Sequence, residues 1–246
     1  MCHSDESSPP RAAGALPSGA HGPIELTADD GNVFAAYAAR AAHSSSRAVI
    51  VMPDARGLHG FYRELAVRFA EIGVDAVAID YFGRTAGIGD RSEAFDFRPH
   101  LEKTTPEGIA ADVAAAAAYL RSLEGGAATA IFTVGFCFGG GYSWRQSADQ
   151  PGLAGAIGFY GRPALAADRI DALRAPLLLL LAGADANLPP GDAESLAAAA
   201  DQRGVASSVV IYPGAPHSFF DRTAADNAHA CADAWSQIQA FMDRYS

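Results

Sequence analysis

The stretch TVGFCFGGGYSW, residues 133–144, decides the fold that we expect for this chain. It begins at the end of an apolar run and continues into a glycine-rich segment with the spacing Gly135-x-Cys137-x-Gly139. A strand that turns abruptly into a helix forces the residue at the bend into a strained backbone conformation, and the residues two positions away must be small. The stretch therefore predicts a nucleophile elbow with Cys137 at its tip.

Short apolar runs alternate with helical segments on both sides of this stretch. After an initial hairpin over 24–39, the expected strands are 48–53, 74–80, 129–134, 154–160, 176–183 and 207–212. The expected helices include 62–73, 105–123 and 225–245. This alternation predicts an α/β fold, with a mostly parallel, doubly wound sheet and helices on both faces. The hairpin, which turns at Asp30-Gly31, adds an antiparallel edge.

The chain is expected to form one domain with an N-terminal extension. Residues 1–22 are rich in Ser, Pro, Ala and Gly and have no apolar period, so they predict a flexible tail. Residues 23–246 are expected to form a single domain, although the length of the chain would suit one large α/β domain or two small ones. Residues 83–104 form the one long irregular connection, and such a loop inside a compact domain is usually functional or mobile.

Composition narrows the class of protein further. The 18 basic and 28 acidic residues give a net charge of −10, which argues against nucleic-acid and membrane-surface partners. The three cysteines have neither metal-ligand nor disulfide spacing, so we expect no metal and a reducing compartment. No run approaches the ~18 apolar residues of a membrane span, and residues 1–22 lack the apolar core of an export signal. We therefore expect a cytoplasmic protein.

Three chemically useful side chains follow the ends of predicted strands. Cys137, Asp185 and His217 each come after such an end, where ligands bind in open parallel sheets. Nucleophile, acid, histidine is also the chain order of the α/β-hydrolase triad. A histidine base makes a cysteine nucleophilic at neutral pH, and an acid fixes the histidine tautomer. The amide of Phe138 would be one oxyanion donor, and the helix that it begins would favour the thiolate.

Several segments together resemble the dienelactone hydrolase family, from the first hairpin to the last helix. They are VIVMPDARGL (49–58), AIDYFGR (78–84), VGFCFGGG (134–141), GFYG (158–161), LAGADANLP (181–189) and GAPHSFF (214–220). The resemblance implies an α/β-hydrolase fold and a hydrolase that needs no cofactor. It also implies that Cys137 is the nucleophile, His217 the base and Asp185 its orienting acid.

The resemblance implies further site residues as well. Asp54 matches an acidic position near the nucleophile, commonly glutamate, although its side chain could equally orient the loop. The amide of Ala55 matches the second oxyanion donor. Arg84 matches an arginine that holds a substrate carboxylate, and Arg222 matches a second one with an offset of one residue. Tyr160 ends a strand that faces the site, where it could donate to substrate or form a pocket wall.

The function remains open among three alternatives, two of which are substrates of a hydrolase. The first is a small lactone such as 4-carboxymethylenebut-2-en-4-olide, which bears a carboxylate, and the second is a neutral ester or thioester. The third is a non-catalytic relative that binds a small ligand. We expect a monomer or a homodimer. We expect structural roles for two other residues. Cys231 lies on a buried helix face, and Asp80 lies at a strand end where it could form a hydrogen bond with a loop.

Overall fold

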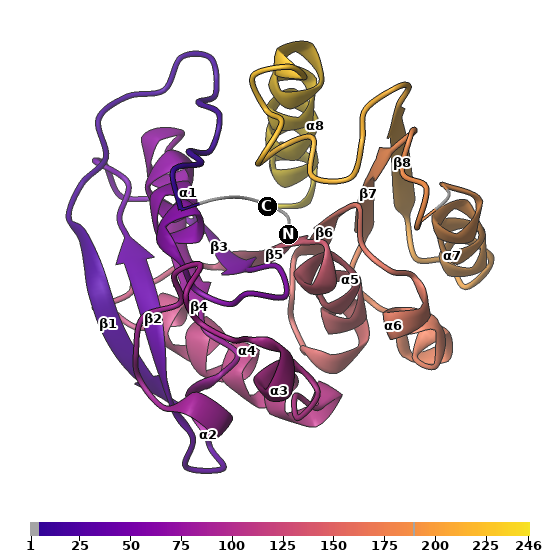
Figure 1. The fold of residues 1–246 in the computed structure, drawn as a ribbon. Coiled ribbons are helices and arrows are strands. Elements are labelled where there is room, and N and C mark those ends of the chain that lie inside the picture. Colours follow the sequence, from indigo (N-terminus) through magenta and orange to yellow (C-terminus); the bar gives the residue numbers. More distant parts are fainter. Residues whose placement is uncertain (1–4, 189) are drawn as a thin grey trace.

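An eight-stranded sheet forms the centre of the computed structural model, which describes residues 5–188 and 190–246 (Figure 1). Its strand order is β1-β2-β4-β3-β5-β6-β7-β8. The strands are β1 His21–Thr27, β2 Val33–Ala39, β3 Arg47–Met52, β4 Asp75–Ile79, β5 Ala130–Phe136, β6 Gly155–Phe159, β7 Leu177–Ala182 and β8 Ser207–Tyr212. In this spatial order every neighbouring pair from β4 to β8 is parallel, whereas β1 with β2 and β2 with β4 are antiparallel. The predicted sheet, mostly parallel with an antiparallel hairpin at its edge, is therefore confirmed.

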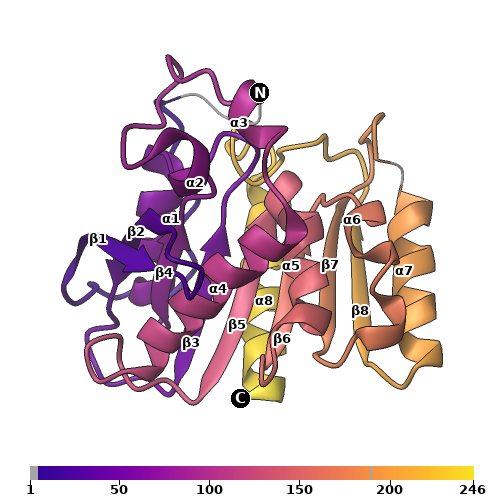
Figure 2. The same ribbon diagram turned by 90° about the horizontal axis from the view of Figure 1, so that it is seen from below.

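Helices cover both faces of the sheet. They are α1 Gly60–Glu71, α2 Gly83–Ala86, α3 Arg98–Leu101, α4 Pro106–Arg121, α5 Phe138–Asp149, α6 Ala164–Ala167, the short 3-10 helix Ile170–Ala172, α7 Pro190–Gln202 and α8 Ala228–Tyr245. The apolar side chains of α1 and α8 pack on one face, and those of α4, α5 and α7 pack on the other. Figure 2 shows this division, with α8 behind the sheet. None of the helices in the described residues has the length and apolar composition of a membrane span.

The central strands are apolar on both faces because helices cover both. Every residue of β4, β5, β6 and β7 is buried, as expected for strands in the middle of a parallel sheet. The first hairpin turns as predicted, with Gly31 at a φ of 85° and the Asn32 amide donating to the Asp30 carboxylate over 3.1 Å. The loops that follow the parallel strands therefore meet at one edge of the sheet, where the expected site residues lie.

The segment expected to be a flexible tail packs on the domain over its described part. β1 already begins at His21, and the first four residues lie outside the described part of the chain. Ala12 is only 7% exposed and joins the core on the α1 and α8 face. The indole N–H of Trp235 donates to the carbonyl of Pro10 over 2.9 Å. Composition could not reveal these contacts, because each depends on one side chain meeting a partner far along the chain.

A buried ion pair anchors the long connection 83–104. The guanidinium of Arg91 donates to the carboxylate of Asp80 over 3.1 and 2.9 Å and lies 4.5 Å from the ring centre of Phe95. Asp80 also accepts from the amide of Leu58 over 3.2 Å, which confirms its expected role in bonding a loop. Burial raises the pKa of Asp80, and Arg91 opposes this. The connection and the loop after β3 therefore share one buried carboxylate.

Candidate active site

Cys137 occupies a sharp bend between β5 and α5. Its φ of 54° and ψ of −110° are strained for a residue with a Cβ, and such strain persists only where the surroundings hold it. The amide of Cys137 donates to the carbonyl of Phe159 over 3.0 Å, which ties the bend to β6. The thiol is partly exposed at the N-terminus of α5. The predicted elbow is therefore present at the predicted residue.

The glycines on either side of Cys137 are required by close backbone contacts. A Cβ on Gly135 would lie 1.9 Å from the carbonyl oxygen of Gly139. A Cβ on Gly139 would lie 2.3 Å from the carbonyl oxygens of both Met52 and Pro53. The elbow is therefore pressed against the end of β3, and this is why the predicted frame contains only glycine at these two positions.

Asp185 and His217 come together beyond the ends of β7 and β8. Nδ1 of His217 lies 2.5 Å from Oδ2 of Asp185, whose other oxygen accepts from the amides of Asn187 and Leu188 over 2.9 and 3.1 Å. The Asp185 side chain is 1% exposed and the His217 side chain 25%. A carboxylate fixed in this way orients the imidazole and stabilises its charged form. With Nδ1 on Asp185, the other ring nitrogen, Nε2, points away from that carboxylate.

Asp54 is buried in the loop after β3 and orients that loop. Its Oδ1 accepts from the amide of Arg56 over 2.9 Å, which supports the loop-orienting alternative for this residue. The hydroxyl of Tyr81 donates to the carbonyl of Pro53 over 2.9 Å, just beside it. Burial raises the pKa of Tyr81 well above its usual value, and the charges of Asp54 and Cys137 contribute. Tyr81 therefore lies within the electrostatic field of both residues.

The two amides expected to bind an oxyanion have no acceptor among the described residues. The amide of Phe138 is the first of α5, where backbone N–H groups lack a helical partner. The amide of Ala55 likewise makes no hydrogen bond within 5–188 and 190–246. Both amides adjoin groups of the candidate site, one following Cys137 and the other following Asp54. This arrangement suits two donors that serve a substrate oxygen.

Tyr160 and Asp221 form a buried pair next to His217. The ring centres of Tyr160 and His217 are 4.8 Å apart, and the Tyr160 hydroxyl lies 2.8 Å from Oδ2 of Asp221. This bond differs from the expected one to substrate. Burial raises the pKa of Asp221 to about 8, with a further contribution from the charge of Asp54. Sequence reasoning missed Asp221, because one acidic residue four positions after a histidine has no distinctive pattern.

The two arginines expected to hold a substrate carboxylate lie in different surroundings. The guanidinium of Arg84 pairs with Asp30 and, over 2.8 Å, with Asp112, so it would have to leave two carboxylates to bind a substrate. Arg222 is exposed, and its backbone amide donates to the carboxyl group of Asp221. The guanidinium of Arg84 is therefore not set aside for substrate. The sequence could not show this, because the acid partners of Arg84 come from the hairpin turn and α4.

A third arginine lies in the loop after β3, next to Ala55. Arg56 is 3% exposed, and its guanidinium lies 2.9 Å from a carboxylate oxygen of Asp5. Asp5 also accepts from the amide of Glu93 over 2.9 and 3.1 Å. The N-terminal segment is thus bonded both to the loop after β3 and to the long connection.

Two further features bear on what the site contains. Cys231 is buried, its thiol lies 3.3 Å from the carbonyl of Phe219, and burial raises its pKa to about 12, so its expected structural role is confirmed. Within the described residues, no three His, Cys, Asp or Glu side chains are grouped as a metal ion would need. Of the two cysteines that the structure describes, Cys137 at the elbow is therefore the partly exposed one.

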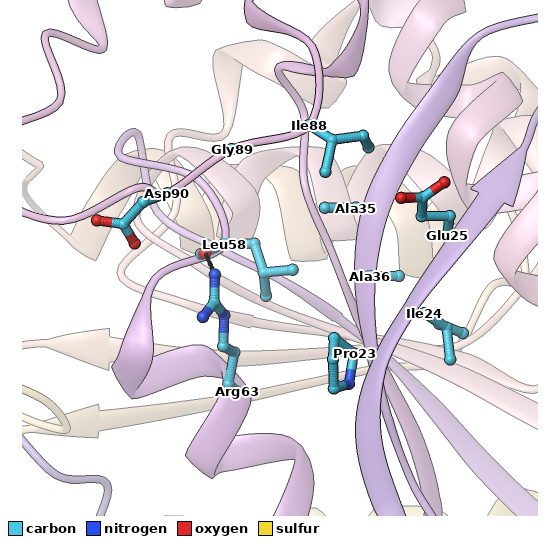
Figure 3. A pocket seen from close by; sticks show the side chains of 10 residues that line it. All are labelled: Pro23, Ile24, Glu25, Ala35, Ala36, Leu58, Arg63, Ile88, Gly89 and Asp90. Atoms are coloured by element: carbon cyan, nitrogen blue, oxygen red, sulfur yellow. Dashed lines mark hydrogen bonds between the residues drawn. The ribbon is translucent and has the colours of Figure 1, made fainter.

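A separate cavity of about 520 Å³ lies between the first hairpin, the start of α1 and the connection 83–104 (Figure 3). Its lining combines the apolar side chains of Ile24, Leu58 and Ile88 with the charged side chains of Arg63 and Asp90. The predicted triad is not part of this lining. The cavity is therefore distinct from the elbow.

Residues 34–246, from the second strand to the end of the last helix, match the dienelactone hydrolase family. The chain belongs to the dienelactone hydrolase family. The match spans the elbow and the loops with Asp185 and His217, so the family resemblance seen in the sequence is confirmed. This dienelactone hydrolase family member is accordingly a hydrolase with an α/β-hydrolase fold.

Similar proteins and structures agree with this membership. A protein of Methylorubrum extorquens, provisionally described as a carboxymethylenebutenolidase, is 24% identical over 235 residues, 91% of this chain and 81% of its own. One of Synechocystis sp. with the same description is 30% identical over 205 residues, 78% of this chain and 83% of its own. A crystal structure from Klebsiella pneumoniae, provisionally described as a dienelactone hydrolase, is 28% identical, with a TM-score of 0.77, and the match covers 92% of this chain and all of that one. The dienelactone hydrolase-like promiscuous phosphotriesterase P91 also has a TM-score of 0.77, with 92% and 99% covered, and at 20% identity it supports the fold alone.

Proposed function

We propose that this hydrolase cleaves a small ester or enol lactone through the thiolate of Cys137, with His217 as general base and Asp185 as its orienting acid. The observation that carries this proposal is the 2.5 Å contact between Nδ1 of His217 and the buried carboxylate of Asp185, in a chain whose elbow bears a cysteine. A lone cysteine at a helix start would be a small buried residue in most proteins. A partly exposed thiol at a strained bend favours a nucleophile instead.

The reaction consists of two acyl transfers. The Cys137 thiolate adds to the carbonyl carbon, and the amides of Ala55 and Phe138 bind the resulting oxyanion. Each such donor is typically worth ~3 kcal/mol of barrier. The carbon–oxygen bond to the leaving group then breaks, and the imidazolium of His217 supplies the proton. Water that loses a proton to His217 next attacks the thioester, which releases the acid and regenerates the thiol.

Thiolate chemistry favours substrates with a stabilised leaving group. The thiolate is itself readily expelled from the tetrahedral intermediate, so the alcohol must leave as a stabilised anion for the reaction to go forward. An enolate meets this requirement better than a simple alkoxide does. The first candidate substrate is therefore an enol lactone such as 4-carboxymethylenebut-2-en-4-olide, in line with the carboxymethylenebutenolidase description of several relatives.

A neutral small ester is the second candidate substrate, and the contacts of Arg84 favour it. Its guanidinium is paired with Asp30 and Asp112, whereas recognition of a substrate carboxylate needs a cation that can turn to the ligand. If this second candidate is right, Arg84→Ala changes KM equally for charged and neutral substrates. A selective rise in KM for the charged lactone would support the first candidate. A cytoplasmic location and a monomeric or homodimeric state remain predictions from the sequence.

The test compares kcat/KM for 4-carboxymethylenebut-2-en-4-olide and for p-nitrophenyl acetate in the wild type and in Cys137→Ala. We expect Cys137→Ala to lose turnover of both and to keep its fold, because the elbow accepts a smaller side chain. The matched control is Cys231→Ala, which removes the other described thiol at a position outside the proposed site. Near-normal turnover by folded Cys137→Ala would overturn the mechanism. The ratio of the two wild-type values chooses between the charged and the neutral substrate.

A further inference from the structure

A buried carboxyl group that the mechanism above does not use lies beside His217. Asp221 is 3% exposed, and its Oδ1 accepts from the amide of Arg222 while its Oδ2 lies 2.8 Å from the Tyr160 hydroxyl. An uncompensated buried carboxylate is costly, so a buried acid without a cationic partner needs a reason to be there. Among the described residues its hydrogen-bonding partners are this amide and this hydroxyl. Asp221 is thus placed to hold Tyr160.

Tyr160 is fixed at both of its ends and contacts the imidazole with its ring. Its φ of 36° lies in the left-handed region, which a bulky residue adopts only where the surroundings impose it. Its amide donates to the carbonyl of Leu180 over 2.9 Å, and its hydroxyl meets Asp221. Between these two anchors, the ring centre lies 4.8 Å from that of His217 and 5.6 Å from that of Phe219. The tyrosine ring therefore forms a fixed wall against the base.

We propose that Asp221 is a positioning residue, which through Tyr160 holds the imidazole of His217 in line between Asp185 and Cys137. The hydrogen bond from Nδ1 to Asp185 fixes one point of the imidazole and leaves the ring free to turn about that point. A fixed ring packed on the imidazole removes this second freedom. This role rests on the proposed function, because it assumes that His217 is the base.

The protonation state of Asp221 determines how much negative charge lies beside His217. The titratable groups that face it are Tyr160 from the end of β6, Asp54 from the loop after β3, His217 from its own loop and Cys231 from α8. Burial raises the pKa of Asp221 to about 8, so at neutral pH the carboxyl group is protonated and adds no charge beside His217. Above that pH a second carboxylate would join Asp54. The added negative charge opposes both the reacting thiolate and the developing oxyanion.

The experiment compares Asp221→Ala, Asp221→Asn and Tyr160→Phe, with p-nitrophenyl acetate as substrate from pH 6 to pH 10. We expect Asp221→Ala and Tyr160→Phe to lower kcat roughly tenfold with KM within about twofold, because a loosened base impairs the reaction more than binding. Asparagine can still bond the Tyr160 hydroxyl and the Arg222 amide, so Asp221→Asn should recover most of the lost kcat. Asp221→Asn should also lack the fall in kcat/KM that we expect near pH 8 in the wild type. Rates are divided by the fraction of folded protein, so a loss of stability alone changes neither kcat nor the pH dependence of kcat/KM.

A second measurement separates this role from the proposed function. The rate at which iodoacetamide alkylates Cys137, read from the mass of its peptide, needs no substrate. If alkylation near pH 7 is no faster in the wild type than in His217→Ala, the thiolate assignment fails, and the proposed function and the role of Asp221 fall together. If His217 does accelerate alkylation but Asp221→Ala has the kcat and the pH profile of the wild type, only the positioning role is overturned.

Discussion

Replacing Asp221 with asparagine should stabilise the folded protein, by an amount that grows with pH. Burial raises the pKa of this carboxyl group from 3.8 to about 8, and the charge of Asp54 adds to the effect. The unfolded chain therefore releases the proton near its ordinary pKa of 3.8, whereas the folded chain keeps it until about 8. Between these values the unfolded state binds fewer protons, so the free energy of unfolding of the wild type falls as the pH rises. Asparagine does not titrate, so the free energy of unfolding of Asp221→Asn lacks this decrease.

The expected size follows from a difference of one proton. Such a difference changes the free energy of unfolding by about 1.4 kcal/mol per pH unit. The advantage of Asp221→Asn over the wild type should therefore increase by roughly 3 kcal/mol between pH 5 and pH 7, and it should level off above about pH 8. Solvent screens this group little, because only 3% of it is exposed. Asparagine can also keep both hydrogen bonds, since its oxygen can accept from the Arg222 amide and its NH₂ can donate to the Tyr160 oxygen.

Urea unfolding of both proteins at pH 5, 6, 7 and 8 measures this advantage, with the free energy extrapolated linearly to water. The matched control is Asp226→Asn, which removes an exposed acid in the same loop. A constant difference between Asp221→Asn and the wild type from pH 5 to pH 8 would refute the reasoning. Asp221 would then ionise alike in the folded and the unfolded chain, and its burial would have to be compensated by a charge.

Three other outcomes test the site and its support. Gly139→Ala should prevent stable folding, since its Cβ would lie 2.3 Å from two carbonyl oxygens at the end of β3. The control is Gly60→Ala, whose Cβ meets nothing within 4 Å and which should leave the circular dichroism and the melting temperature unchanged. Asp185→Asn should lower kcat by roughly 10³- to 10⁴-fold, because the wrong tautomer of the base is favoured; an unchanged kcat would refute its role. Deleting residues 1–12 removes the hydrogen bond to Trp235, the Asp5 partner of buried Arg56 and the core contact of Ala12, so the loss should exceed the ~1 kcal/mol of the hydrogen bond alone and lower the melting temperature by at least a few degrees. An equal melting temperature would indicate that this segment adds no stability.

The elbow and the sheet could be predicted because their signals are local. A strand buried on both faces needs an unbroken apolar run, and β5 and β7 show this directly in the sequence. The glycines around Cys137 follow from backbone atoms that approach within a few residues, and the contact between Gly135 and the carbonyl of Gly139 is one of these. The loops with Asp185 and His217 could be placed because parallel strands end at a common edge. Chain order and strand ends were therefore enough to place Asp185 and His217 at the same edge.

Side-chain partners from distant elements left no such signal. Arg84 matched a family position, yet its partners Asp30 and Asp112 lie 54 and 28 residues away. The hydroxyl of Tyr160 likewise meets an acid 61 residues further along the chain. Each of these contacts involves one side chain and one partner, without periodicity or fixed spacing. A sequence position can therefore match a family motif while its side chain is bound to something else.

The overall acidity of the chain makes the charge of a substrate harder to predict than the positions of Cys137, Asp185 and His217. With 28 acidic residues against 18 basic ones, a buried or half-buried arginine finds an acid partner readily, as Arg56 does with Asp5 and Arg91 does with Asp80. Recognition of an anionic substrate needs the opposite, a cation that the protein has not already neutralised. Asp221, four residues after His217, is buried, whereas Arg222, which follows it, is exposed. The contact between Asp185 and His217 depends on local loop geometry, so the overall acidity does not alter it, whereas the charge preference of the proposed site depends on which ion pairs form.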